Sequence, residues 1–250
     1  MKLFISILFS CFLITCMPAI AQEVSQLNKV TEQMKLLRES YDTRPVSFDL
    51  RYVYSNEHTP ADILDSLSGN IIMDSTNYRC ILDNTETISN GKYNIILFKE
   101  DQVMYLSKGT ATNATQDPLQ TIQTVLEKSG ASGCTITNNK RNKVIHIDFV
   151  PGGACKQIEM VIDTVARRLL SMEYIVRTSQ LMEIPGATGS EQPEGYEEFA
   201  RVRADFYNYR FLLPDKSRFD ERTFFYKEGD TFKTTAAYSS YKIFIATPNL

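Results

Sequence analysis

The segment TETISNGKYNIILFKEDQVMYLSK, residues 85–108, constrains the fold more than any other part of the chain. It contains three short runs of apolar and polar residues that are typical of β-strands, and Asn90-Gly91 separates the first two. This dipeptide predicts a two-residue hairpin turn of type I′, because both central residues of that turn need a positive φ. With the corner there, Ile88 would face Tyr93 across the ladder.

Apolar side chains occupy both faces of the predicted hairpin. Tyr93, Ile95 and Leu97 share one face, while Ile96 and Phe98 lie on the other. An antiparallel sheet with one face in water alternates more cleanly than this. We therefore expect both faces to be partly covered, either in the interior of a sandwich or in a barrel that wraps around something.

The rest of the chain reads as about a dozen strands with few helices. Apolar residues in steps of three and four predict an amphipathic helix over 24–41. Capping signals predict a short helix over 59–67 and a second clear helix over 117–129. Strands are predicted at 46–54, 69–74, 77–83, 85–89, 92–99, 102–107, 134–138, 143–150, 157–163, 168–177, 200–213, 222–227, 230–235 and 240–246.

The first residues predict a signal peptide rather than part of the fold. Lys2 gives a positive start, residues 3–14 form an apolar run, and Ala19-Ile20-Ala21 is a cleavage signal before Gln22. We expect export to the periplasm and a mature protein that begins at Gln22. A rival interpretation takes residues 13–16 as a lipoprotein signal, which would leave a lipid anchor on Cys16.

The mature chain, residues 22–250, is expected to form a single domain. A stretch rich in Gly, Pro and Glu at 183–198 predicts an exposed loop. Cys134 and Cys155 flank a predicted hairpin and are the favoured disulfide pair in an oxidising compartment, with a buried free thiol as the alternative for each. Cys80 would be the odd cysteine.

No residue pattern predicts catalysis, metal binding or nucleic-acid binding. His58 and His146 lack partners at the spacing of a metal site or a catalytic triad. The cysteine of PGGAC, residues 151–155, lacks a neighbouring base and a helix N-terminus. The formal net charge of −3 offers no basic face for nucleic acid. The sequence therefore predicts a protein that is not an enzyme and needs no cofactor.

The order of these elements over about residues 24–178 resembles the LolA/LolB-type outer-membrane lipoprotein carriers. The most specific similarity is ETISNGK, residues 86–92, a turn that the family often carries after a strand with an aromatic residue and an arginine. The resemblance implies an unclosed β-barrel with a helical lid and a hydrophobic cavity that takes acyl chains. Two departures stand out: Asp74-Ser75-Thr76 replaces the family's Arg-Pro, and the aromatic C-terminal third is longer than in a simple carrier.

Together these features predict an α+β protein, a curved antiparallel sheet that forms an incomplete β-barrel around helices. The expected function is non-catalytic binding of lipoprotein acyl chains or other apolar cargo. The alternative is a scaffold or interaction subunit of an envelope or secretion assembly, with envelope membrane proteins as partners. The expected cavity residues are Phe48, Leu50, Tyr52, Tyr78, Ile88, Tyr93, Ile95 and Met104.

Overall fold

The computed structural model describes residues 18–109, 130–181, 194–247 and 250. The α-helix is α1 (Pro18–Asp42), and the 3₁₀ helices are η1 (Thr178–Gln180), η2 (Lys216–Phe219), η3 (Glu221–Thr223) and η4 (Ala236–Tyr238). The strands are β1 (Val46–Asn56), β2 (Ile63–Asp74), β3 (Asn77–Leu82), β4 (Thr85–Ser89), β5 (Tyr93–Phe98), β6 (Val103–Lys108), β7 (Ala131–Asn139), β8 (Asn142–Phe149), β9 (Cys155–Asp163), β10 (Arg168–Arg177), β11 (Phe199–Phe211), β12 (Phe225–Glu228), β13 (Thr231–Thr234) and β14 (Lys242–Ile245).

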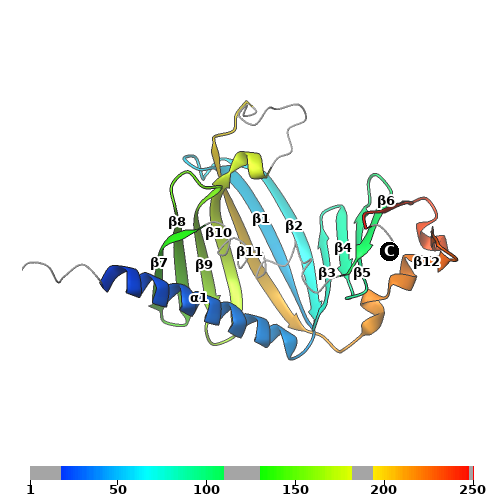
Figure 1. Ribbon diagram of the computed structural model, residues 1–250, viewed down its shortest axis with the longest axis horizontal. Coiled ribbons are helices and arrows are strands. Elements are labelled where there is room, and N and C mark those ends of the chain that lie inside the picture. The colour runs from blue at the N-terminus through cyan, green and yellow to red at the C-terminus, as the bar shows by residue number, and fades with distance from the viewer. Residues whose placement is uncertain (1–17, 110–129, 182–193, 248–249) are drawn as a thin grey trace, which may run out of the picture.

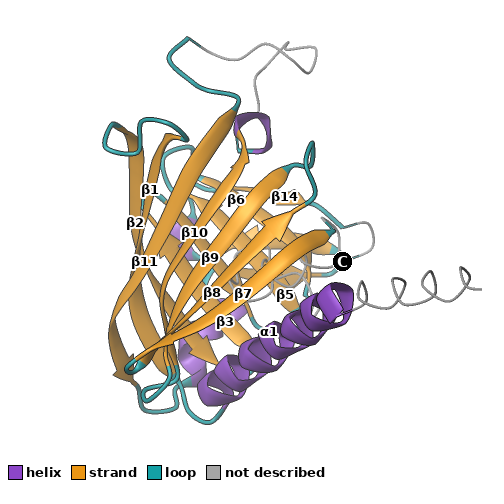
Figure 2. Ribbon diagram, turned by 90° about the vertical axis from the view of Figure 1, so that its left-hand side faces the viewer, coloured by secondary structure: helices purple, strands orange, loops and turns teal. Residues whose placement is uncertain are grey.

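Within these residues one large sheet dominates the molecule (Figure 1). Its strand order is β14-β6-β5-β4-β3-β2-β1-β11-β10-β9-β8-β7, and every pair is antiparallel except β14 with β6. The sheet curls strongly, as the side view shows (Figure 2). Strands β14 and β7 remain at opposite edges. The predicted unclosed, curved sheet is therefore confirmed.

Helix α1 covers one face of this sheet. Its buried residues are Val30, Met34, Leu37 and Tyr41, and steps of three and four place them on one stripe. The helix crosses the strands near one end of the sheet (Figures 1 and 2). Among the described residues, α1 is the one α-helix. This part of the chain therefore does not form the predicted sheet wrapped around several helices.

Two other predicted helices have different outcomes. The helix over 59–67 is wrong: β2 begins at Ile63 and pairs with β1 along the length of that strand. The helix over 117–129 lies outside the described residues.

Cross-strand partners share a face of the sheet, so the register defines two faces from β1 to β14. We call the face that packs on α1 the helix face and the opposite one the reverse face. One row of partners on the helix face is Phe48, Ile71, Cys80, Thr87, Ile96, Tyr105 and Phe244. The adjacent row on the reverse face is Ser47, Ile72, Arg79, Ile88, Ile95, Leu106 and Ile245.

Each face contributes to a separate hydrophobic core. On the helix face, side chains of β1–β3 and β7–β11 form one core cluster with α1. On the reverse face, a second core joins β4–β6 to the C-terminal segment, which we define as residues 212–250. The sheet contributes Ile88, Tyr93, Ile95, Leu97, Met104 and Leu106 to it, and the segment contributes Phe219, Phe224 and Phe225. The reverse face of the hairpin is thus covered, as expected, whereas on the helix face Asn94 is buried and Phe98 remains exposed.

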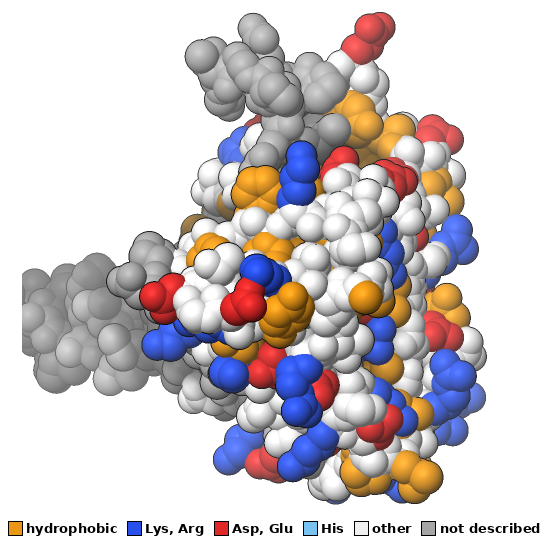
Figure 3. Space-filling view, turned by 90° about the vertical axis from the view of Figure 1, so that its right-hand side faces the viewer, with side chains coloured by type: hydrophobic (Ala, Val, Ile, Leu, Met, Phe, Trp, Pro, Cys, Tyr) orange, Lys and Arg blue, Asp and Glu red, His pale blue; other side chains and the backbone are white. Residues whose placement is uncertain are grey.

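The rest of the reverse face mixes charged side chains with apolar ones such as Ile175 and Phe199. Arg201 on β11 pairs with Glu173 on β10, and Arg203 pairs with Asp205 two residues further along the same strand. Figure 3 shows a different side of the molecule, on which β12 and the C-terminal segment lie, and there too basic and acidic side chains are intermixed with scattered hydrophobic ones. These contacts explain the arginines of β11 as partners in a charged, solvated sheet face.

The hairpin turn lies one residue later than predicted. The backbone N–H of Asn90 donates to Tyr93 O at 3.2 Å, so Gly91 and the residue after it form the two-residue loop. Gly91 has a φ of 77°, while Asn90 does not take a positive φ. This pattern is that of a type II′ turn, which needs glycine only at its first central position. As a result Ile88 faces Ile95, and its predicted partner was wrong.

The predicted disulfide is also wrong. Cys80, Cys134 and Cys155 are buried free thiols. Strand β8 lies between the strands that carry Cys134 and Cys155. Two strand spacings amount to about 10 Å, beyond the Cα separation that a disulfide spans. Burial raises the pKa of Cys155 to about 11, which keeps this thiol protonated.

Candidate functional site

The eight predicted cavity residues divide equally between the two faces of the sheet. Those on the helix face are Phe48, Leu50, Tyr52 and Tyr78. Those on the reverse face are Ile88, Tyr93, Ile95 and Met104. Because a sheet separates the two sets, they do not line one common cavity.

On the helix face, Phe48 and Leu50 belong to a filled interior. The Phe48 ring stacks on Tyr209 with centroids 4.8 Å apart and meets Phe206 edge-on at 6.0 Å. Tyr41 of α1 completes this aromatic cluster at 6.1 Å from Phe48. These contacts hold α1 on the sheet and leave Phe48 the role of a packing residue.

On the reverse face, the C-terminal segment covers the four predicted residues. Tyr93 meets Phe225 and Phe232 of the β12–β13 hairpin edge-on, with centroids 5.1 and 6.2 Å apart. Ile88, Ile95 and the neighbouring residues of this core are no more than 9% exposed. The four predicted cavity residues on the reverse face therefore belong to a structural core.

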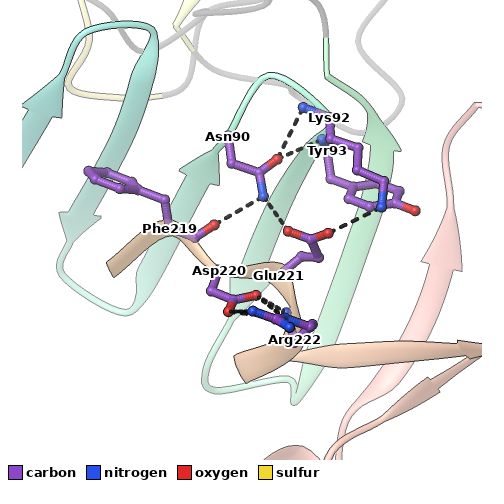
Figure 4. A network of polar contacts seen from close by, with 7 residues as sticks. All are labelled: Asn90, Lys92, Tyr93, Phe219, Asp220, Glu221 and Arg222. Carbon is purple, nitrogen blue, oxygen red and sulfur yellow. Dashed lines mark hydrogen bonds and ion pairs between the residues drawn. The ribbon is translucent and has the colours of Figure 1, made fainter. Parts of the chain in front are cut away.

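A polar clamp at the tip of the β4–β5 hairpin fixes the C-terminal segment (Figure 4). The Asn90 amide nitrogen donates to Phe219 O at 3.0 Å and to Glu221 Oε2 at 2.7 Å. Its amide oxygen accepts from the backbone N–H groups of Lys92 and Tyr93 at 3.1 and 2.9 Å. One side chain thus closes the turn and binds a segment 129 positions away.

Two ion pairs surround this clamp (Figure 4). Lys92 Nζ donates to Glu221 Oε1 at 3.2 Å, and this hydrogen bond raises the pKa of Lys92. Asp220 accepts from the backbone N–H of Arg222 and from its guanidinium, which lowers the pKa of Asp220 to about 2. Asp220 also serves as the N-cap of η3 and so shapes the chain that Asn90 holds.

The helix face keeps exposed apolar surface at the other end of the sheet. Phe98, Tyr105 and Phe244 form what we call the aromatic stripe, with exposed fractions of 37%, 39% and 46%. Tyr105 meets Phe98 edge-on at 5.8 Å and stacks on Phe244 at 5.3 Å. Since β14 supplies Phe244, the C-terminal segment extends the stripe as well as covering the reverse face.

Sequence reasoning found only part of this stripe. The sequence correctly predicts that Phe98 lies on the face opposite Tyr93, but it does not predict Tyr105 and Phe244 as candidate binding residues. Consecutive apolar residues in the strand at 103–108 predict apolar side chains on both of its faces, and this was the sequence pattern that could have indicated Tyr105. Phe244 joins the stripe through a parallel pairing with a strand far away in the sequence, which no local pattern indicates.

Each histidine makes a polar contact with a carboxylate. His58 Nδ1 lies 2.7 Å from Glu197 Oε2, and His146 Nε2 lies 3.1 Å from Asp148 Oδ1. Among the described residues, no three His, Cys, Asp or Glu side chains converge in a way that could hold a metal ion. No helix in this part of the chain is long and apolar enough to cross a membrane.

Structural comparison finds proteins of similar shape at low sequence identity. An uncharacterized conserved protein from Thermus thermophilus matches over 76% of this chain and 92% of its own, with 8% identity and a TM-score of 0.44. The LolA superfamily protein NE2245 from Nitrosomonas europaea matches over 76% and 96%, with 6% identity and a TM-score of 0.33. LprF from Mycobacterium bovis matches over 74% and 97%, with 11% identity and a TM-score of 0.32.

One of these similar proteins bears the name of the superfamily that the sequence resembles. No family model and no curated protein sequence matches the chain. The fold and the site described above rest on this chain's own contacts.

Proposed function

We propose that the protein is a non-catalytic carrier of apolar cargo, such as the acyl chains of lipoproteins, in the periplasm. The observation that carries this proposal is the aromatic stripe of Phe98, Tyr105 and Phe244 on the helix face of an unclosed sheet. Its location in the periplasm rests on the signal peptide predicted over residues 1–21. An intact mass that shows a lipidated Cys16 would contradict cleavage before Gln22.

The stripe is large enough to matter for binding. A Phe or Tyr side chain buries roughly 150–250 Å², so covering the exposed part of three rings removes about 200 Å² from water. At about 25 cal/mol per Å² this amounts to about 5 kcal/mol before the entropic cost of association. An acyl chain lying along the stripe would gain this contribution without any movement of the packed core under α1.

Tyr52 is a predicted cavity residue that lies away from the stripe, because β2, β3 and β4 separate its strand from β5. It lies half-buried on the helix face, packs against the core cluster and pairs with the exposed Leu67 of β2. Burial raises the pKa of Tyr52 to about 12, so its hydroxyl stays neutral. Tyr78, on the same face, is buried more deeply within the core cluster.

Binding of a fluorescent fatty acid tests the proposal. Tyr105→Ser and Phe244→Ser should each weaken binding several-fold and leave the melting temperature nearly unchanged, because both rings are exposed. Tyr226→Ser is the matched control, since Tyr226 is an equally exposed aromatic residue of the β12–β13 hairpin. The proposal is wrong if wild-type protein does not bind the probe, or if all three variants bind it equally well.

A second candidate function is an interaction subunit of an envelope assembly. It is favoured by the first half of β2, which pairs with β1 while β3 joins β2 only from Gly69 onward. Ile63, Leu64 and Leu67 are exposed along this free edge. An exposed apolar edge is a template for strand addition by a partner protein. Leu64→Lys should abolish co-purification of such a partner and leave fatty-acid binding intact.

A further inference from the structure

Two buried oxygens on adjacent strands of the helix face, Thr87 Oγ1 on β4 and Asn94 Oδ1 on β5, have no hydrogen-bond partner. The Tyr54 hydroxyl on β1 is a third such oxygen among the described residues. Asn94 is one of the few buried polar residues of the described chain, and its amide nitrogen donates to Lys108 O at 3.4 Å. This bond orients the amide so that its oxygen is the atom left without a donor.

The register places both oxygens next to each other. Thr87 pairs with Ile96, and Ser89, two residues further along β4, pairs with Asn94. Thr87 and Asn94 are therefore diagonal neighbours on one face, roughly 7 Å apart between Cα atoms. On β3 the adjoining residues of this face are Tyr78 and Cys80, both part of the apolar core.

This arrangement is costly for the protein alone. More than about nine in ten buried polar groups in folded proteins are hydrogen-bonded, and each exception calls for an explanation. Two unpaired oxygens side by side are explained if a bound molecule supplies the missing partners, and Ser89 and Ser107, the cross-strand partners of Asn94, flank them on the same face. The aromatic stripe lies on the same face. Thr87, Ile96 and Tyr105 follow one another in one row of cross-strand partners, so a single residue lies between Thr87 and the stripe.

We propose that Thr87 and Asn94 form a polar subsite that recognises the head of the cargo while its apolar chain lies on the aromatic stripe. This inference rests on the proposed carrier function and names the chemical class of its ligand. Asn94 Oδ1 only accepts, so the ligand must donate a hydrogen bond to it, whereas the Thr87 hydroxyl either donates or accepts. An amide or a hydroxyl next to an acyl chain meets both requirements, and an ester lacks the donor.

Competition between two ligands with the same chain tests this subsite. Oleamide and methyl oleate would each displace a fluorescent fatty acid from the full mature protein. We expect wild-type protein to prefer oleamide by about three- to tenfold, the effect of one net hydrogen bond. Thr87→Val and Asn94→Leu should reduce this preference towards one.

The melting temperature provides a second measurement, because removal of a hydroxyl with a purely structural role would lower it. Removing an unpaired buried hydroxyl should leave the melting temperature of Thr87→Val unchanged or raise it by about 2–4 °C. Thr135→Val is the matched control, since Thr135 is an exposed threonine of β7, at the opposite edge of the sheet from the stripe. It should alter neither the preference nor the binding of either ligand.

The outcomes separate this inference from the carrier function. Wild-type protein that binds both ligands equally would overturn the polar subsite and leave the carrier function in place. A lower melting temperature for Thr87→Val with an unchanged preference would also overturn the subsite, because it would assign the hydroxyl a structural role. Failure to bind either ligand would overturn the carrier function, and the subsite with it.

Discussion

At the scale of single residues, Asp163 organises the turn between β9 and β10. Its Oδ1 accepts from the backbone N–H groups of Val165 and Ala166, both at 2.9 Å. Its Oδ2 accepts from the Arg141 guanidinium at 2.6 Å. The backbone hydrogen bond from Ala166 and the other donors lower the pKa of this carboxyl below its usual value.

This lowered pKa predicts how Asp163 contributes to stability as the pH changes. The folded state binds fewer protons than the unfolded state, so the contribution is fully present above the unfolded pKa of about 3.9. It is lost as the pH falls through the lower pKa of the folded state. Asp163→Asn should therefore cost about 1–2 kcal/mol at pH 6 and progressively less below pH 4, measured by urea unfolding.

The exposed Asp101, in the turn between β5 and β6, supplies the control for this measurement. Asp101→Asn should change the free energy of unfolding at pH 6 by less than about 0.5 kcal/mol, as is usual for an exposed surface substitution. A difference between Asp163→Asn and wild-type protein that stays constant from pH 6 to pH 2 would contradict the assigned role.

The hairpin tip shows how far sequence reasoning reaches at this scale. Asn90-Gly91 predicted the turn correctly, because the demand for a positive φ is local and Gly91 meets it. The corner was placed one residue early, because the Asn90 side chain binds Phe219 and Glu221 instead of adopting a left-handed backbone. That choice depends on contacts between distant parts of the chain.

At the scale of elements, the strands were largely predictable and the error at 59–67 has a clear cause. Alternating polarity is a local property, and it gave β1 and β3–β6 close to their observed bounds. Thr59-Pro60 is an equally local helix-start signal. Pairing with β1 overrides it from Ile63 onward, because the ladder satisfies the backbone groups of this segment that point towards β1.

The β12–β13 hairpin provides a test at this scale, because neighbouring aromatic residues have opposite surroundings. Phe225 is 2% exposed and packs on Tyr93, whereas Tyr226 is 48% exposed. Phe225→Ala should cost about 3–5 kcal/mol by loss of buried area and formation of a cavity. Tyr226→Ala should change the free energy of unfolding by less than about 0.5 kcal/mol. Equal costs in denaturant unfolding would show that the hairpin does not seal the reverse face.

At the scale of the whole molecule, the assignment of faces could not be predicted. A period of two shows which residues of one strand share a face, but a shift of one residue in the register exchanges the faces of the next strand. The error at the hairpin corner moved the predicted partner of Ile88 from Ile95 to Tyr93, a shift of two residues, and so did not itself exchange the faces. The eight predicted cavity residues were all apolar strand residues, yet they divide between two cores.

The C-terminal segment supplies the last prediction. Removing residues 213–250 would uncover Ile88, Tyr93, Ile95, Leu97, Met104 and Leu106 together, and none of them is more than 9% exposed in the full chain. It would also leave β6 as a sheet edge, because β14 pairs with it there. A contiguous apolar face next to a free edge favours association between copies.

We therefore expect the truncated protein to aggregate in size-exclusion chromatography and to bind a hydrophobic dye strongly. Asn90→Ala is the control, since it removes the clamp on Phe219 and Glu221 but leaves the aromatic packing of the segment in place. This variant should remain monodisperse and unfold at a lower denaturant concentration. A truncated protein that stays monodisperse with unchanged dye binding would mean that the segment does not shield the reverse face, and that the second core is not needed for the sheet to fold.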